Sequence, residues 1–267
     1  MNQTLDEVVV SLDWLVAHLD DPELVIVDVR PRDHFAAGHI PGARTLDLYP
    51  LKLLASDPET IDVWVATVET ALERAGIGHN DRVVFYEDFS GTVAARAVWL
   101  MHALSITPHA ALLDGGLTAW LQAGQAVSTE PAQVQPTTLT ARLDTSQLAT
   151  ASDILTSLGD DADRTTIVDT RSDLEWMQGT IPGARHLEWV RHLTPDGRLR
   201  SPDELRALYR EAGIAPDQPA ITFCATGYRA AHTWLVLRLL GNDAVRNYAP
   251  SWAEWGRRGD LPIESPR

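Results

Sequence analysis

The chain is poor in cysteine: Cys224 is the only one among its 267 residues. A single cysteine cannot form an internal disulfide or a zinc site built from several cysteines. Free thiols persist in reducing compartments. We therefore expect a cytoplasmic protein.

Long apolar runs are also missing. No stretch approaches the ~20 apolar residues that span a bilayer, and the opening MNQTLDEVVVSLDW lacks the basic start and apolar core of a signal peptide. Basic residues are outnumbered, with 22 Lys and Arg against 37 Asp and Glu and a net charge of −15. We expect no membrane partner and no nucleic-acid partner bound through a general positive field, so an anion site must be local.

What is present is an ordinary globular composition, 45% hydrophobic and 22% charged. The length suits one large or two ordinary domains. An internal repeat favours two. IVDVRPRDHFAAGHIPGA (26–43) and IVDTRSDLEWMQGTIPGA (167–184) share nine identities at a constant offset of 141.

The repeat continues at slightly smaller offsets, as expected when loops differ in length. VVFY (83–86) matches AITF (220–223) at an offset of 137, and DGGLTAW matches APSWAEW at 135. Between the halves, QAVSTEPAQVQPTTLTAR is rich in Thr, Gln and Pro without an apolar period. We predict two homologous domains, 1–124 and 143–267, joined by an extended linker, 125–142.

Strand and helix patterns alternate in each half. LVIVDVR, TTIVDTR, VVFY and AITF are short β-branched runs typical of strands buried on both faces. Helical stretches lie between them, and Ser201, Pro202 and Glu204 form a capping pattern at one start. The predicted fold class is α/β, each domain a mainly parallel sheet flanked by helices. The expected helices are 63–75, 92–104, 201–212 and 228–240.

Ligands of such sheets bind outside the carboxyl ends of the strands, which is where Cys224 follows AITF. A six-residue turn containing Gly227 and Arg229 should then lead into a helix. The positive helix end and Arg229 would favour a thiolate. A cysteine after an apolar strand is often only a small buried hydrophobe, but the glycine loop and the arginine favour a nucleophile.

At this point the sequence resembles a known family. CATGYRA is similar to the active-site loop of rhodanese-type sulfurtransferases, VDxR…GxIPGA in both halves to another signature, and YAPSWAEW to the C-terminal one. The resemblance covers nearly the whole chain, as a tandem rhodanese of the thiosulfate and 3-mercaptopyruvate sulfurtransferase family. It implies that Cys224 is catalytic. It also implies that the first half, with Glu87 or Asp88 at the equivalent position, is catalytically inactive and packs against the second half to form a wall of the site.

The resemblance implies an EC 2.8.1 enzyme working through a persulfide. The Cys224 thiolate takes a sulfane sulfur from a small anionic donor and passes it to cyanide or a thiol. No metal and no cofactor are required. Loop N–H groups would stabilise the terminal sulfur; the loop residues are Ala225, Thr226, Gly227, Tyr228, Arg229 and Ala230.

The donor is predicted to be thiosulfate, with 3-mercaptopyruvate as the alternative. CATGYRA lacks the basic pair that follows the cysteine in thiosulfate-preferring members. The segment from Asp169 to Gly179 lacks the arginine-bearing insertion of mercaptopyruvate enzymes. Two roles are open for Arg229: it shapes the loop by pairing with an acid, or it faces the donor.

Asp169 and Arg171 carry over from the D-x-R signature as supporting residues. The same pair recurs as Asp28 and Arg30 in the half without cysteine. This recurrence favours a structural ion pair, although Asp169 could also contact the loop. His232, one helical turn beyond the loop, is expected at the surface or in an ion pair.

Two rival functions remain. Cysteine-dependent phosphatases and arsenate reductases have five residues between Cys and Arg, whereas four separate Cys224 from Arg229. The shorter cradle suits one sulfur atom better than a phosphate. The second rival is a low-turnover persulfide carrier, serving a sulfur-accepting protein, or a redox-sensing module.

Overall fold

The computed structural model describes residues 8–159 and 165–266, which fall into two compact units. The first contains the described residues up to Leu51 together with Val65–Leu143 and Leu193–Leu199. The second contains Lys52–Trp64, Asp144–His192 and the described residues from Arg200 onward. Each unit therefore includes one segment from the other half of the sequence. The limits 1–124 and 143–267 remain our proposal for the two duplicated halves.

The first unit is built on a five-stranded sheet in the order β1-β5-β4-β2-β3, with all pairs parallel. One face packs an apolar cluster against α1, α2 and α5, and α4 contacts β4 and β5. The strands are β1 Val9–Val10, β2 Leu24–Asp28, β3 Arg44–Thr45, β4 Arg82–Tyr86 and β5 Ala110–Leu113. The helices are α1 Leu12–Ala17, α2 Arg32–Ala37, η1 Tyr49–Leu51, α4 Thr92–Ala103, α5 Gly116–Gln122 and α3 Pro58–Arg74, whose residues 58–64 belong to the second unit.

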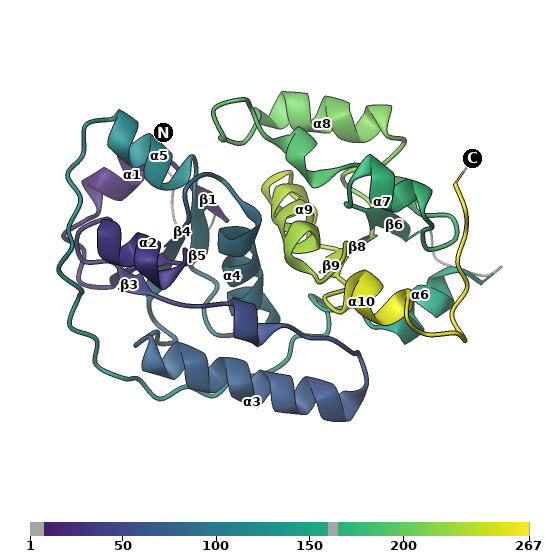
Figure 1. Cartoon of the computed structure of the whole chain (residues 1–267), viewed down its shortest axis with the longest axis horizontal. Coiled ribbons are helices and arrows are strands. Elements are labelled where there is room, and N and C mark those ends of the chain that lie inside the picture. The colour runs from purple at the N-terminus through teal and green to yellow at the C-terminus, as the bar shows by residue number, and fades with distance from the viewer. Residues whose placement is uncertain (1–7, 160–164, 267) are drawn as a thin grey trace. The chain divides into compact units, whose positions relative to one another are not determined.

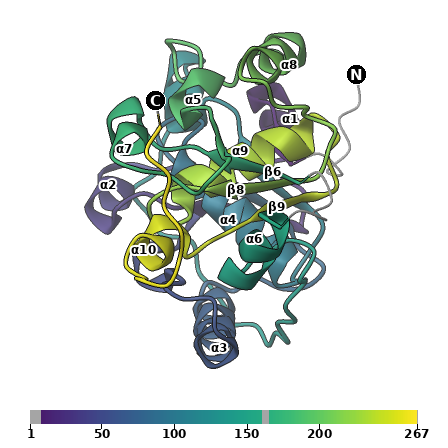
Figure 2. The same cartoon turned by 90° about the vertical axis from the view of Figure 1, so that its right-hand side faces the viewer.

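The second unit repeats this plan with four parallel strands in the order β7-β6-β8-β9. Its apolar cluster joins the sheet to α6 and α10, and α9 contacts β8 and β9 (Figures 1 and 2). The strands are β6 Thr166–Asp169, β7 Arg185–His186, β8 Ala220–Phe223 and β9 Val245–Asn247. The helices are α6 Ala151–Ser157, α7 Asp173–Met177, η2 Trp189–His192, α8 Pro202–Glu211, α9 Tyr228–Leu239 and α10 Ser251–Trp255.

The predicted α/β class, with two parallel sheets flanked by helices, is confirmed. The predicted cap of α8 is also present, since Ser201 and Glu204 form a reciprocal capping box. One helix was predicted too short: α3 starts at Pro58 and not at residue 63. The carboxylate of Asp57 accepts the N–H of Thr60 at 3.0 Å, which satisfies a donor of the first turn.

Segments 52–64 and 193–199 form specific hydrogen bonds within the units to which they belong. In the first unit, Ser90 donates its N–H to Gly197 O at 2.9 Å, and Leu199 donates to Asp114 Oδ1 at 2.9 Å. In the second, the N–H and the hydroxyl of Ser56 donate to Glu254 Oε1 at 3.0 and 3.1 Å.

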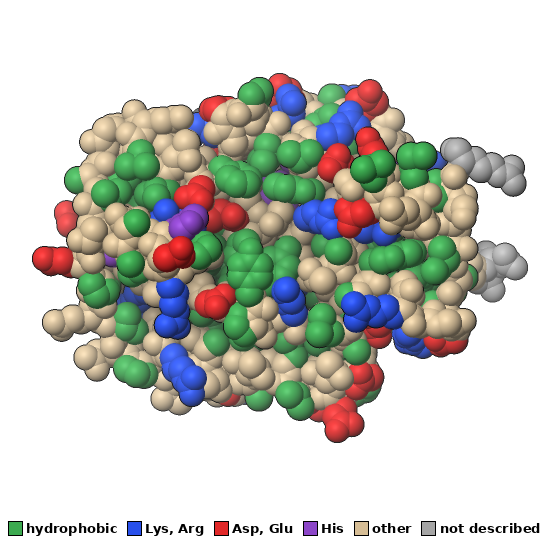
Figure 3. Space-filling model, in the orientation of Figure 1, with side chains coloured by type: hydrophobic (Ala, Val, Ile, Leu, Met, Phe, Trp, Pro, Cys, Tyr) green, Lys and Arg blue, Asp and Glu red, His purple; other side chains and the backbone are tan. Residues whose placement is uncertain are grey.

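Charges of both signs are interspersed with apolar side chains on the face drawn in Figure 3. Within the described ranges, no helix is long and apolar enough to cross a membrane.

Candidate active site

Cys224 lies at the carboxyl end of β8 and is buried, with 1% of its surface exposed. The predicted six-residue turn is shorter in the structure, because α9 already begins at Tyr228. Gly227 ends the turn in the left-handed region at φ +85°, a conformation that favours glycine. Tyr228, Arg229 and Ala230 therefore form the first turn of α9.

The sulfur of Cys224 faces the start of α9. Gly227 donates its N–H to Sγ at 3.1 Å. The turn is held from two sides: Asn247 Nδ2 donates to Gly227 O at 3.3 Å, and the hydroxyl of Thr222 donates to Ala230 O at 3.0 Å. A rigid N–H and the positive end of a 12-residue helix stabilise negative charge on sulfur.

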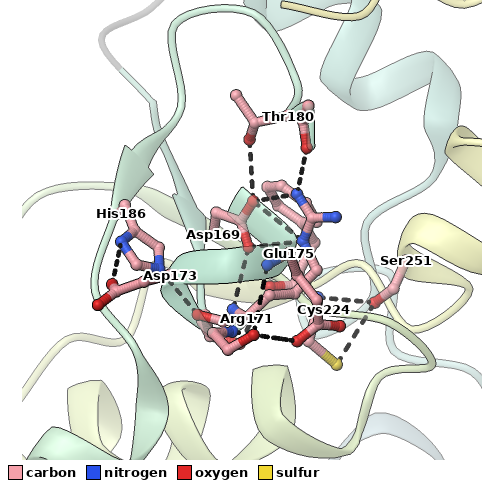
Figure 4. A network of polar contacts seen from close by, with 12 residues as sticks. Asp169, Arg171, Asp173, Glu175, Thr180, His186, Cys224 and Ser251 are labelled. Carbon is pink, nitrogen blue, oxygen red and sulfur yellow. Dashed lines mark hydrogen bonds and ion pairs between the residues drawn. The ribbon is translucent and has the colours of Figure 1, made fainter. Parts of the chain in front are cut away.

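Helix α10 holds the backbone of Cys224 from the other side. Trp252 donates its N–H to Cys224 O at 3.0 Å, and Ala253 donates to Ala225 O at 2.9 Å. The N–H of Cys224 donates to Ser251 Oγ at 3.1 Å, and the same oxygen lies 4.0 Å from Sγ (Figure 4). The nucleophile is thus fixed at its N–H, its carbonyl and its sulfur.

Arg229 is engaged by a residue that the sequence analysis did not identify. Its guanidinium donates to both carboxylate oxygens of Glu175, at 2.6 and 2.8 Å. The pKa of Arg229 is raised by Glu175 and, less strongly, by the Cys224 sulfur, while burial opposes the rise. The arginine lowers the pKa of Glu175 to about 2. The spacing of Ser172 and Glu175 could have indicated a capping box, but not this ion pair.

Asp169 and Arg171 form a buried ion pair at 2.5 Å, as the sequence predicted. Arg171 also donates to Gly179 O at 2.7 Å and lies 4.2 Å from the centre of the Trp252 ring. The Asp169 carboxylate also accepts the hydroxyl of Thr180 at 2.9 Å. Among the described residues Asp169 makes no hydrogen bond to the loop 225–230. The pair instead braces the segment that follows α7 (Figure 4), and Arg171 packs on the Trp252 ring of α10.

His232 is not at the surface, and this part of the prediction is wrong. Its ring is fully buried, stacked on His192 at 5.5 Å and edge-on to Trp189 at 5.2 Å. Tyr209 stacks on the other ring of the pair, His192, at 5.4 Å. The histidines are thus part of the packing between α9, η2 and α8.

The equivalent position in the first unit is Glu87, which settles the choice between Glu87 and Asp88. Leu117 donates its N–H to Glu87 O at 2.8 Å and Thr118 donates to Asp88 O at 2.9 Å, the pattern seen at Cys224 and Ala225.

The Glu87 side chain folds back onto the start of α4. Its Oε1 accepts the N–H groups of Val93 and Ala94 at 2.8 and 3.0 Å. Burial raises the pKa of Glu87 to about 7, although these two hydrogen bonds oppose the rise. In the first unit a carboxylate therefore lies at the start of α4, whereas in the second unit the Cys224 sulfur lies at the start of α9.

Comparison with known proteins identifies this arrangement. The family profile of the rhodanese-like domain matches residues 11–123 and again 150–258. The chain belongs to the rhodanese family. This tandem rhodanese is 33% identical over 279 residues to the sulfur carrier protein TtuD of Thermus thermophilus, with 96% of each chain covered.

It is also 33% identical over 262 residues to a thiosulfate sulfurtransferase of Pseudomonas aeruginosa, covering 94% of each chain. The rhodanese fold is seen in the crystal structure of SseA, a 3-mercaptopyruvate sulfotransferase of Escherichia coli. That match has a TM-score of 0.79 at 24% identity and covers 92% of this chain and 99% of SseA. Among the described residues of this rhodanese, no group of three or more His, Cys, Asp or Glu is placed to hold a metal.

Proposed function

We propose that this rhodanese is a sulfurtransferase that carries sulfur as a persulfide on Cys224, with thiosulfate as the preferred donor. The observation that carries the proposal is the contact of Cys224 Sγ with the N–H of Gly227 at the start of α9. This geometry stabilises an anionic sulfur without a metal or another cofactor.

The reaction proceeds in two displacements. The Cys224 thiolate attacks the outer sulfur of thiosulfate, the S–S bond of the donor breaks, and sulfite leaves with the bonding electron pair. The persulfide anion remains beside the first turn of α9. Cyanide then attacks its terminal sulfur, so that thiocyanate leaves and the thiolate is restored. A thiol acceptor takes the sulfur in the same way.

The charges near the loop suit an anionic donor. Arg229 lies close enough to Cys224 for the sulfur to raise its pKa. Lys52, the only lysine of the chain, belongs to the same unit and places its nitrogen 6.0 Å from the centre of the Tyr228 ring. In a chain of net charge −15, these cations supply a local field for thiosulfate.

The surroundings of the reaction follow from the same chemistry. We place it in the cytoplasm, where the single cysteine stays reduced. A second function is the transfer of the persulfide to a sulfur-accepting protein, supported by the similarity to a protein named as a sulfur carrier.

Intact-protein mass spectrometry without reductant tests the proposal. Thiosulfate should add one sulfur mass to the wild type, cyanide should remove it as thiocyanate, and Cys224→Ser should gain nothing. 3-Mercaptopyruvate is tested in parallel, and faster loading from it would overturn the choice of donor. Sulfur that still loads onto Cys224→Ser would overturn the mechanism. Loading without multiple turnover on cyanide would favour the carrier function.

A further inference from the structure

Ser251 has a backbone conformation that L residues rarely adopt. Its φ is +56°, and among the described residues only Ser105 shares a positive φ without being glycine. Ser251 is fully buried and opens α10. Backbone strain of this kind persists only where its surroundings hold it, and it concentrates at functional sites.

The duplicated half provides an internal comparison. The residue that matches Ser251, at the offset of 135, is Gly116, and its φ is +54°. It opens α5 as Ser251 opens α10, and the two N–H groups that follow it bond Glu87 O and Asp88 O as their counterparts bond Cys224 O and Ala225 O. The turn therefore forms with glycine, and it does not require the serine side chain.

The half that has the cysteine nevertheless carries a hydroxymethyl group at this strained position. The Ser251 hydroxyl donates to Tyr248 O at 2.7 Å and accepts the N–H of Cys224 at 3.1 Å. Its oxygen is in contact with Sγ at 4.0 Å, which is too long for a strong hydrogen bond. The hydroxyl therefore acts on the sulfur through the backbone of Cys224.

We propose that Ser251 is a positioning residue for the persulfide chemistry, retained at the cost of backbone strain. Its hydroxyl satisfies the buried N–H of Cys224 and fixes that residue so that Sγ stays on the N–H of Gly227. The first half has Glu87 in place of the nucleophile and carries glycine there. The inference rests on the proposed function of Cys224.

Two variants separate the hydroxyl from the strain. Ser251→Gly removes both, and the turn at Gly116 shows that glycine forms this conformation. Ser251→Ala removes the hydroxyl but keeps the β-carbon at positive φ. We expect Tm to fall in both variants, because both leave the buried N–H of Cys224 without the hydroxyl, and to fall further in Ser251→Ala, which keeps the strain.

Activity should follow the hydroxyl instead. Both variants should load sulfur from saturating thiosulfate about 10- to 100-fold more slowly than the wild type, because Sγ loses its fixed position on the N–H of Gly227. The KM for thiosulfate should change less than about threefold, because the Ser251 hydroxyl is already engaged by Tyr248 O and the N–H of Cys224. Wild-type loading rates in Ser251→Gly would overturn the proposal and leave the serine without a role in positioning.

Alkylation of Cys224 by iodoacetamide, followed by intact mass, tests the positioning independently of sulfur transfer. Both variants should be alkylated more slowly than the wild type near neutral pH, because the thiolate loses its alignment with the N–H of Gly227. If no donor loads the wild type, the proposed function fails, and the alkylation rates still decide the role of Ser251. Equal alkylation rates in all three proteins would refute that role.

Discussion

The carboxylate of Glu87 should make the first unit less stable as the pH rises. Its pKa is raised from 4.5 to about 7, chiefly by burial. Between about pH 4.5 and 7, Glu87 therefore keeps its proton in the folded chain but has released it in the unfolded chain. This contribution to stability is fully present below about pH 4.5 and is lost as the pH rises through about 7.

Replacing Glu87 by Gln keeps the oxygen that accepts the N–H groups of Val93 and Ala94 but removes the titration. At about 1.4 kcal/mol for each pKa unit, a shift from 4.5 to about 7 sets an upper limit of about 3 to 4 kcal/mol on the effect. Glu87 keeps partial exposure, so solvent screening reduces this value. We expect the free energy of unfolding of Glu87→Gln to exceed that of the wild type by about 1–2 kcal/mol near pH 8, and the two values to be nearly equal near pH 4.5.

Urea unfolding at a series of pH values measures this difference. Hydrogen exchange in peptides that span β4 and α4 assigns it to the first unit. Glu23→Gln is the matched control, since it removes an exposed carboxylate from the same unit and should show no such pH dependence. Sulfur loading of Cys224 should stay within a few-fold in Glu87→Gln. A stability difference that is constant between about pH 4.5 and 8 would refute a protonated, buried Glu87.

Three further predictions concern the second unit. Arg229→Ala should raise the KM for thiosulfate about tenfold. Glu175→Gln frees the guanidinium of Arg229 from its ion pair and should lower the KM. A fall in Tm in both variants without a change in KM would show that the pair only shapes the loop. Lys52→Met should raise the KM for thiosulfate several-fold at low ionic strength, and this effect should vanish in high salt if Lys52 acts through its charge. Burial lowers the pKa of His192, so the free energy of unfolding should fall as the pH drops below about 6.5. His192→Phe keeps the stack on Tyr209 and should reduce that fall, as measured by urea unfolding.

The fold could be predicted because the same signals occur twice. β-branched runs such as 24–28 and 220–223 are buried on both faces, as parallel strands require. The cap at Ser201 is local, so four consecutive residues were enough to identify it. The predicted start of α3 was too late: the buried spacing of Ile61, Trp64 and Val68 already begins before residue 63, and only the first turn from Pro58 precedes it.

The site was only partly predictable because its contacts join distant segments. Glu175 and Arg229 are 54 residues apart in the chain, and their pairing depends on how α7 faces α9. His232 lies on a helix with η2 packed on it, which no local pattern shows. The choice between Glu87 and Asp88 required the backbone, because the first loop has one residue more than Cys224–Gly227 before its helix begins.

Segments 52–64 and 193–199 each belong to the compact unit formed mainly by the other half of the sequence. A cut within the linker 125–142 would separate the repeats in sequence but would leave each without a piece that belongs to its unit. Ser90 and Asp114 would lose the backbone of Gly197 and Leu199, and Glu254 would lose Ser56. We therefore expect neither repeat, expressed alone, to reproduce the stability of its share of the whole chain.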